Sequence, residues 1–120
     1  DIHANIDPES VNKALMSLLS SAVYAVNKKA KKAQYKPEVK LSLKPVDSDV
    51  EIRIYDNGIG IEETILDKVY DPFFTTKTTG EGTGVGLFLT REIIQAHGGS
   101  ITLKSVKDDH TEFLITLKKL

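Results

Sequence analysis

Cysteine is absent from the 120 residues, so the chain forms neither a disulfide nor a thiolate metal site. No apolar run approaches the ~20 residues that span a bilayer, and the first residues lack the pattern of a signal peptide. The formal net charge is −1, so no global basic field recruits nucleic acid. These absences are compatible with a domain in a reducing, cytoplasmic compartment, and they argue against nucleic acid as a partner.

The chain has the size and composition of one globular domain. Its 120 residues, 40% apolar and 28% charged, suffice for a hydrophobic core, and we find no repeat, linker or low-complexity tract. We expect residues 1–120 to be one domain cut from a longer chain. A local basic run consists of Lys28, Lys29, Lys31 and Lys32. We interpret it as a solvated helix end, whose positive charges interact favourably with the helix dipole; a binding site for a partner is the alternative.

Hydrophobic periodicity predicts an α+β sandwich with a mixed, mostly antiparallel five-stranded sheet and about three helices on one face. Asp7-Pro8-Glu9 has the pattern of a helix start, with Asp7 as the cap, and the helix should run to about Ala33. The expected strands lie near residues 2–6, 39–43, 50–54, 101–103 and 113–117, and the other expected helices cover 62–69 and 85–96.

A run of alternating glycines extends from Gly80 to Leu87 and leads directly into a helical pattern. Glycine backbone and a helix N-terminus together offer N–H donors to a phosphate group. A dinucleotide-binding fold is excluded because no βαβ unit surrounds the run, and a Walker loop is excluded because no Gly-Lys-Ser/Thr ends it. A flexible loop without a ligand remains open on this segment alone.

A second segment, Asp56-Asn57-Gly58-Ile59-Gly60-Ile61, follows the strand near residues 50–54. A carboxylate held at a strand end can accept a hydrogen bond from the exocyclic amine of adenine. The alternative is a type I′ hairpin turn at Asn57-Gly58. The residues after Gly60 have a helical rather than a strand pattern, which argues against a hairpin.

A third segment, Asp71-Pro72-Phe73-Phe74-Thr75-Thr76-Lys77, lies between the two glycine boxes, and His97-Gly98-Gly99 follows them. In this order the segments closely resemble the catalytic ATP-binding domain of bacterial sensor histidine kinases. That domain belongs to the wider ATPase group with gyrase, heat-shock-90 and MutL proteins. The resemblance covers nearly the whole chain and implies the Bergerat ATP-binding fold. The short segment between the boxes resembles the short-lid, nitrogen-regulator type.

The resemblance implies a role for each matched residue. Asp56 would bind the adenine amine, and Gly58, Gly60 and Ile61 would form that wall of the pocket. Phe73, with Phe74, would pack the base of a lid, or serve as an ordinary core aromatic. Lys77 would approach the terminal phosphates as a catalytic residue, or be a solvated lid charge. The implied phosphate loop consists of Gly82, Thr83, Gly84, Val85, Gly86 and Leu87.

The first long helix departs from the family pattern at two positions. Family members carry Asn-x-x-x-Asn-Ala, whose second Asn holds the Mg²⁺ that bridges the ATP phosphates, whereas this chain has Ser17 and Ser21. A serine hydroxyl can ligate Mg²⁺ but is a shorter, weaker donor. Hydrolytic members carry a glutamate where Ser17 stands, and serine is no base. We therefore expect transfer of the γ-phosphoryl group to a histidine on a separate helical domain rather than hydrolysis.

Two other functions stay open on the same fold: a pseudokinase or nucleotide sensor, motivated by the two serines, and a serine kinase that inhibits a sigma factor. The expected partners are the protein's own phosphoacceptor domain and a response regulator. We expect a monomeric isolated domain within a homodimeric full-length protein, with anchoring in the inner membrane left open. His97 is expected to be structural rather than the phosphorylated residue, and His3 and His110 to be exposed.

Overall fold

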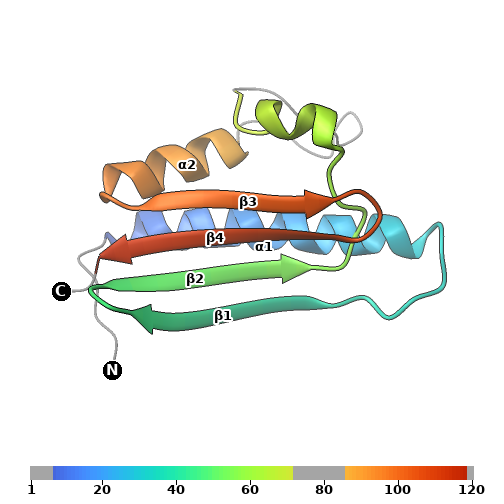
Figure 1. Cartoon of the computed structure of the whole chain (residues 1–120), viewed down its shortest axis with the longest axis horizontal. Helices are drawn as coiled ribbons and strands as arrows, with labels where there is room; N and C mark the ends of the chain where they lie inside the picture. The colour runs from blue at the N-terminus through green and yellow to red at the C-terminus, as the bar shows by residue number, and fades with distance from the viewer. Residues whose placement is uncertain (1–6, 72–85, 119–120) are drawn as a thin grey trace.

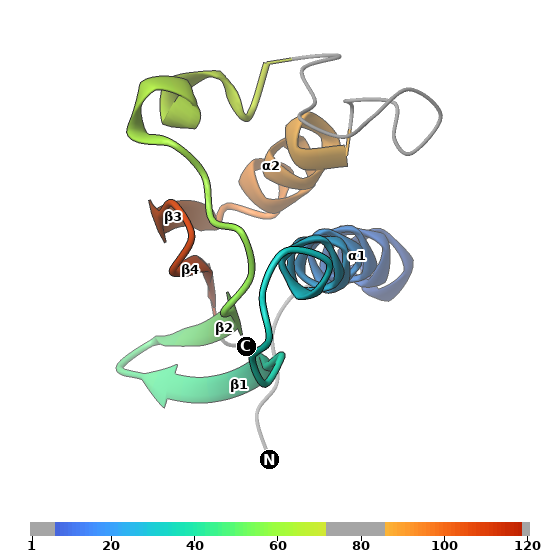
Figure 2. The same cartoon turned by 90° about the vertical axis from the view of Figure 1, so that its right-hand side faces the viewer.

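A four-stranded antiparallel sheet covered on one face by two helices forms the body of the molecule (Figures 1 and 2). The computed structural model of the chain describes residues 7–71 and 86–118. Its elements are α1 (Pro8–Ala30), β1 (Val39–Val46), β2 (Asp49–Asp56), the 3-10 helix η1 (Glu63–Lys68), α2 (Gly86–Ala96), β3 (Ser100–Val106) and β4 (His110–Lys118). The strand order is β1-β2-β4-β3, and η1 lies beyond the β3 edge.

The predicted α+β class is confirmed, with differences at three elements. The strand expected near residues 2–6 lies outside the described residues, within which the sheet has four strands rather than five. The short helix expected over 62–69 is the 3-10 helix η1. Helix α1 ends at Ala30 rather than Ala33, and the Lys32 N–H donates to the Lys29 carbonyl three residues back, which tightens the chain into a turn there.

The core lies between α1 and the two central strands. Buried side chains recur every three or four residues along α1, which places them on one face of the helix, and at every second residue along β2 and β4. The central cluster consists of Ala14, Leu18, Ala22, Val50, Ile52, Ile54, Ile94, Phe113, Ile115 and Leu117. The buried face of α1 therefore packs against the buried face that β2 and β4 share, and together they form one core.

The start of α1 is joined to the end of α2 through His97. Its Nε2 accepts the backbone N–H of Asp7 at 2.9 Å, and its Nδ1 lies 2.7 Å from the Ile93 carbonyl oxygen. Nδ1 therefore carries the hydrogen of a neutral ring, and the expected structural role of His97 is confirmed. Asp7 is the N-cap residue of α1, as predicted, but its carboxylate makes no cap bond to the helix backbone and instead accepts the Ser10 hydroxyl at 2.6 Å.

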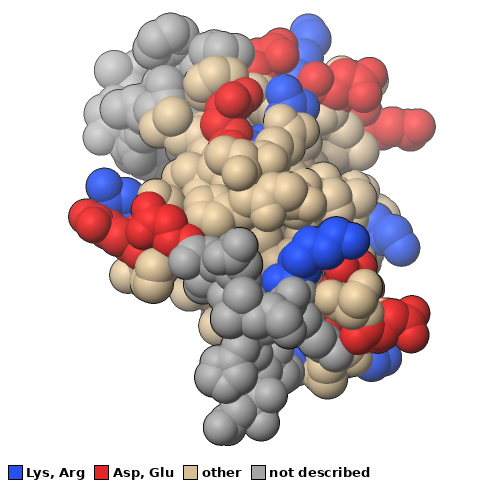
Figure 3. Space-filling view, turned by 90° about the vertical axis from the view of Figure 1, so that its left-hand side faces the viewer, with Lys and Arg blue, Asp and Glu red and all other residues tan. Residues whose placement is uncertain are grey.

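The edge strand β1 is exposed along nearly its whole length. Leu41 and Leu43 pair with Ile54 and Ile52, so they project on the helix-bearing side of the sheet, yet more than half of each is exposed. At the end of the molecule where α1 begins, Lys/Arg and Asp/Glu side chains intermingle around an uncharged centre (Figure 3). Among the described residues, neither α1 nor α2 has the length and hydrophobicity of a membrane-spanning helix.

Truncating Leu18 and Leu43 to alanine should separate core packing from edge exposure. Leu18 is fully buried, so Leu18→Ala should lower the free energy of unfolding by about 3–5 kcal/mol through lost contacts and a residual cavity. Leu43→Ala should lower it by less than about 1 kcal/mol, because that side chain is already in solvent. Urea denaturation followed by circular dichroism measures both, and equal losses would contradict the placement of α1 on the sheet.

Candidate functional site

A buried carboxylate stands at the end of β2. Asp56 is the last residue of that strand and is only 4% exposed. Its Oδ1 accepts the backbone N–H of Gly58 at 2.9 Å. Burial raises the pKa of Asp56 to about 6 from an ordinary 3.8, against the opposing effects of the Gly58 N–H and the nearby His110 and Lys29. No strand follows directly, so the alternative of a hairpin turn at Asn57-Gly58 is wrong.

Gly58 allows the segment after β2 to lie directly against α1. A Cβ on Gly58 would stand 2.4 Å from the carbonyl carbon of Ala25, a distance that no side chain tolerates. The next residue, Ile59, donates its N–H to the Ala25 carbonyl oxygen at 3.3 Å. The glycine is therefore required for contact between backbones, and this contact sets the position of the preceding carboxylate.

Gly60 likewise allows close backbone contact, here with the turn between β3 and β4. Its φ is +65°, and an added Cβ would lie 2.1 Å from the Val106 carbonyl oxygen. On either side of it, Ile59 accepts the Asp108 N–H at 2.6 Å and Ile61 donates its N–H to Ser105 Oγ at 2.8 Å. The segment 57–61 is thus held between α1 and the β3–β4 turn.

The side chain of Asn57 attaches the same segment to the connection between α1 and β1. Its Oδ1 accepts the Glu38 N–H at 2.7 Å, and its Nδ2 donates to the Lys36 carbonyl oxygen at 2.9 Å. Its own N–H donates to the Glu38 carbonyl oxygen at 3.1 Å. Asn57 therefore has a structural role beside the functional candidate Asp56.

A hydroxyl pair on the neighbouring strands completes the surroundings of Asp56. Thr111 is the cross-strand partner of Asp56 and is buried. Ser105 Oγ lies 2.8 Å from Thr111 Oγ1 and donates to the His110 carbonyl oxygen at 2.9 Å. The sequence analysis did not identify Thr111 or Ser105. Thr111 could have been found as a polar residue in phase with the inward-facing Phe113 and Ile115.

Ser17 and Ser21 are half-buried and lie one turn apart on α1. Helical periodicity places the two serines on one flank of α1, and Leu19 and Val26 on the other. The flank with Leu19 and Val26 faces the α1–β1 connection, where Tyr35 donates to the Val26 carbonyl oxygen. The serines therefore lie toward α2. As ligands for Mg²⁺ they offer only neutral hydroxyl groups, and no acidic or histidine cluster that could hold a metal occurs among the described residues. These donors alone do not form a protein Mg²⁺ site.

The predicted phosphate loop falls largely outside the described residues. Helix α2 begins at Gly86, one residue after the predicted start at Val85. Leu87 packs half-buried against the core. The predicted site residues that lie outside the described ranges are Phe73, Lys77, Gly82, Thr83, Gly84 and Val85.

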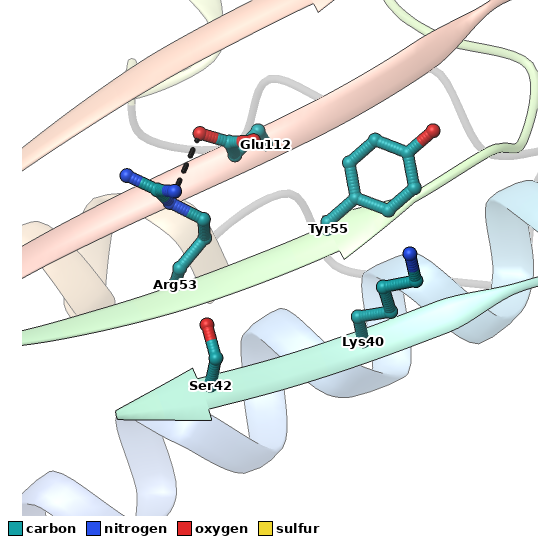
Figure 4. Close-up of a pocket in the computed structure, with 5 residues that line it drawn as sticks. All are labelled: Lys40, Ser42, Arg53, Tyr55 and Glu112. Atoms are coloured by element: carbon teal, nitrogen blue, oxygen red, sulfur yellow. Dashed lines mark ion pairs between the residues drawn. The ribbon is translucent and has the colours of Figure 1, made fainter. Parts of the chain in front are cut away.

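A shallow hollow of about 230 Å³ lies on the opposite face of the sheet (Figure 4). It is lined by Lys40, Ser42, Arg53, Tyr55 and Glu112. Arg53 Nε forms an ion pair with Glu112 at 3.2 Å, and Lys40 forms one with Glu38 at 3.4 Å, so the charges that line the hollow are paired. None of the predicted site residues lines this hollow.

Replacing Asp56 by asparagine should stabilise the ligand-free fold. A carboxyl group whose pKa is raised by folding contributes stability that is complete below pH 3.8 and lost as the pH rises through about 6. At pH 7.5, Asp56→Asn should therefore raise the free energy of unfolding by up to about 3 kcal/mol, at roughly 1.4 kcal/mol per pKa unit. Urea titrations from pH 4 to 8 measure this gain, which should shrink toward pH 4. Asp67→Asn, at an exposed carboxylate, is the control, and an equal effect there would contradict the assignment.

Comparisons with known proteins identify relatives of this chain. The signal transduction histidine-protein kinase AtoS of Escherichia coli (strain K12) is 37% identical over 117 residues, covering 94% of this chain and 17% of that protein. The sensor protein kinase WalK of Staphylococcus epidermidis is 33% identical over 121 residues, covering 97% of this chain and 19% of that protein. The chain thus spans less than a fifth of the length of these curated relatives.

The fold matches solved histidine kinase domains. The catalytic domain of the histidine kinase ThkA, in a nucleotide-free form, superposes with a TM-score of 0.78 at 27% identity, covering 97% of this chain and 70% of that one. Residues 6–120 also match the family described as histidine kinase-, DNA gyrase B- and HSP90-like ATPases. The chain therefore belongs to this ATPase family, and its homologues are sensor histidine kinases.

Proposed function

We propose that this domain binds ATP with the adenine base against Asp56 and presents the γ-phosphoryl group to a histidine on a separate domain. The buried carboxylate is the observation that carries the proposal. Asp56 is 4% exposed, and no described residue forms an ion pair with it. Because a buried charge needs partners, a ligand that donates hydrogen bonds to this carboxylate is favoured.

Adenine has the matching chemistry. Its exocyclic amine is a donor, and Asp56 is an acceptor when ionised. The adjacent hydroxyl of Thr111 supplies a second polar group at the same end of the sheet. Guanine carries a carbonyl oxygen where adenine carries the amine, so the carboxylate would repel it. The site therefore favours ATP and ADP over GTP.

The relatives support the reaction class. They are sensor histidine kinases, and phosphoryl transfer relies mainly on positioning and charge stabilisation rather than on covalent chemistry by the protein. Ser17 stands where a hydrolytic glutamate would be required, which favours transfer to an acceptor histidine over hydrolysis. The proposed partners are a phosphoacceptor helical domain, with its histidine, and a response regulator. We propose that the domain works in the cytoplasm, as a monomer when isolated and within a homodimeric full-length protein.

Nucleotide binding should depend on Asp56 and on pH. We expect calorimetry to show ADP binding at pH 7.5 that weakens as the pH falls through about 6, where Asp56 takes up a proton. Asp56→Asn should weaken ADP binding about tenfold to a hundredfold, because the adenine amine loses a charged acceptor. Asp67→Asn is the matched control. A wild-type chain that releases no heat with millimolar ADP, or that binds GTP as tightly as it binds ATP, would overturn the proposal.

A pseudokinase or nucleotide sensor is the second candidate, and the half-buried serines favour it. Ser17 and Ser21 replace both asparagines of the family pattern and leave only hydroxyl donors on this flank of α1. Such a domain would bind ATP through Asp56 and transfer its phosphoryl group slowly. Phosphorylation of an added acceptor domain, compared between the native chain and the Ser17→Asn/Ser21→Asn double variant, separates the two candidates.

Magnesium should tighten ATP binding more strongly after Ser21→Asn than in the native chain. An amide oxygen reaches further than a serine hydroxyl and is a better ligand for Mg²⁺. We expect the ratio of ATP affinities with and without Mg²⁺ to rise about threefold to tenfold, within the range for one added hydrogen bond or ligand. Ser20→Asn, at an exposed position on the same helix, is the control. An unchanged ratio in Ser21→Asn would show that this position does not contact the metal.

A further inference from the structure

Lys29 contacts both backbone segments that surround the candidate site. Its Nζ donates to the Asp108 carbonyl oxygen at 2.8 Å and to the Asn57 carbonyl oxygen at 3.3 Å. Asn57 directly follows Asp56, and Asp108 lies in the turn between β3 and β4. One ammonium group thus bridges α1 to two segments that are far from it in sequence.

An aromatic ring holds the ammonium group in place. Lys29 Nζ lies 4.8 Å from the centre of the Tyr35 ring, within the range of a cation–π contact. Tyr35 is itself fixed, because its hydroxyl donates to the Val26 carbonyl oxygen at 2.8 Å. Two carbonyl groups and one ring face therefore define the position of Lys29. This corrects its interpretation as one of four solvated lysines at a helix end.

The Asp108 carbonyl belongs to a turn that needs such support. Asp108 adopts a φ of +63°, which is unfavourable for a residue with a side chain. Its N–H donates to the Ile59 carbonyl oxygen at 2.6 Å while its own carbonyl accepts from Lys29. Lys29 therefore stabilises the turn that holds segment 57–61 from the side opposite α1.

We propose that Lys29 is a positioning residue for nucleotide recognition, which fixes the wall carrying Asp56 by binding the Asn57 and Asp108 carbonyl groups. The inference rests on the proposed function. The positive charge of Lys29 also favours the ionised form of Asp56, since Lys29 and His110 both lower the pKa of Asp56 against the effect of burial. Tyr35 lies on the same side, and burial, followed by the smaller effect of the Asp56 charge, raises the pKa of its hydroxyl.

The test compares three variants of the full 120-residue chain by calorimetry with ADP between pH 5.5 and 8.5. Lys29→Met removes the ammonium group and keeps most of the aliphatic chain. Lys29→Arg keeps the charge, and its planar group can reach both carbonyls and stack on Tyr35. Lys32→Met removes the same charge from an exposed lysine just beyond the helix.

Lys29→Met should weaken ADP binding about tenfold, the loss typical of hydrogen bonds from a charged group. It should also shift the acidic limb of the binding curve to higher pH, because Asp56 loses a neighbouring cation. Lys29→Arg should restore both the affinity, to within about threefold, and the acidic limb, whereas Lys32→Met should change neither. If Lys29→Met does not fold, Lys29→Gln keeps a donor without the charge, and its acidic limb should shift in the same direction.

The outcomes separate this inference from the function on which it rests. If the native chain does not bind ADP, the proposed function itself is wrong. A native chain that binds ADP, with a folded Lys29→Met variant of equal affinity and equal acidic limb, overturns only the role of Lys29. Equal weakening by Lys29→Met and Lys32→Met also overturns it, because a general loss of positive charge would then be sufficient.

Discussion

The close approach of α1 to the segment after β2 is the constraint on which the rest of the site depends. The backbone at Gly58 lies so near Ala25 that a Cβ would come within 2.4 Å of its carbonyl carbon. This contact places α1 against the end of β2, where Asp56 is only 4% exposed. Burial raises the pKa of Asp56 to about 6, and above that pH the ionised carboxylate is a buried acceptor in need of a donor. A single backbone contact therefore links the packing of the fold to the chemistry of the site.

A buried carboxylate makes the ligand-free fold less stable than it could be. The structure compensates in part with the Gly58 N–H and with the charges of His110 and Lys29. Full compensation would need a neutral side chain or a direct ion pair, and either would weaken the charged acceptor that the proposed nucleotide base would use. Binding sites commonly keep such a conflict between stability and function. The conflict at Asp56 therefore supports a ligand at this position better than a glycine motif alone does.

Most of the fold was predictable because its elements carry local patterns. The alternation in β2 and β4 and the spacing of buried residues in α1 come directly from the periods of strand and helix. Element ends were less accurate, as at Ala30, because a helix end depends on which carbonyl accepts the next N–H groups. Asp56, Gly58 and Gly60 were predicted to be site residues from the family resemblance that their motif carries. The contacts that explain the two glycines, with Ala25 and Val106, lie far away in sequence and could not be read from it.

Lys29 shows where sequence interpretation failed and what signal it contained. In composition the four lysines at the end of α1 are equivalent, and only their direction around the helix distinguishes them. Lys29 lies four residues after Ala25 and seven after Ala22, so it continues the buried stripe, whereas Lys31 and Lys32 point to solvent. A lysine in phase with a buried stripe must bring its ammonium group to acceptors on another segment. Those acceptors are the Asn57 and Asp108 carbonyls, the latter 79 residues away, and only the folded chain identifies them.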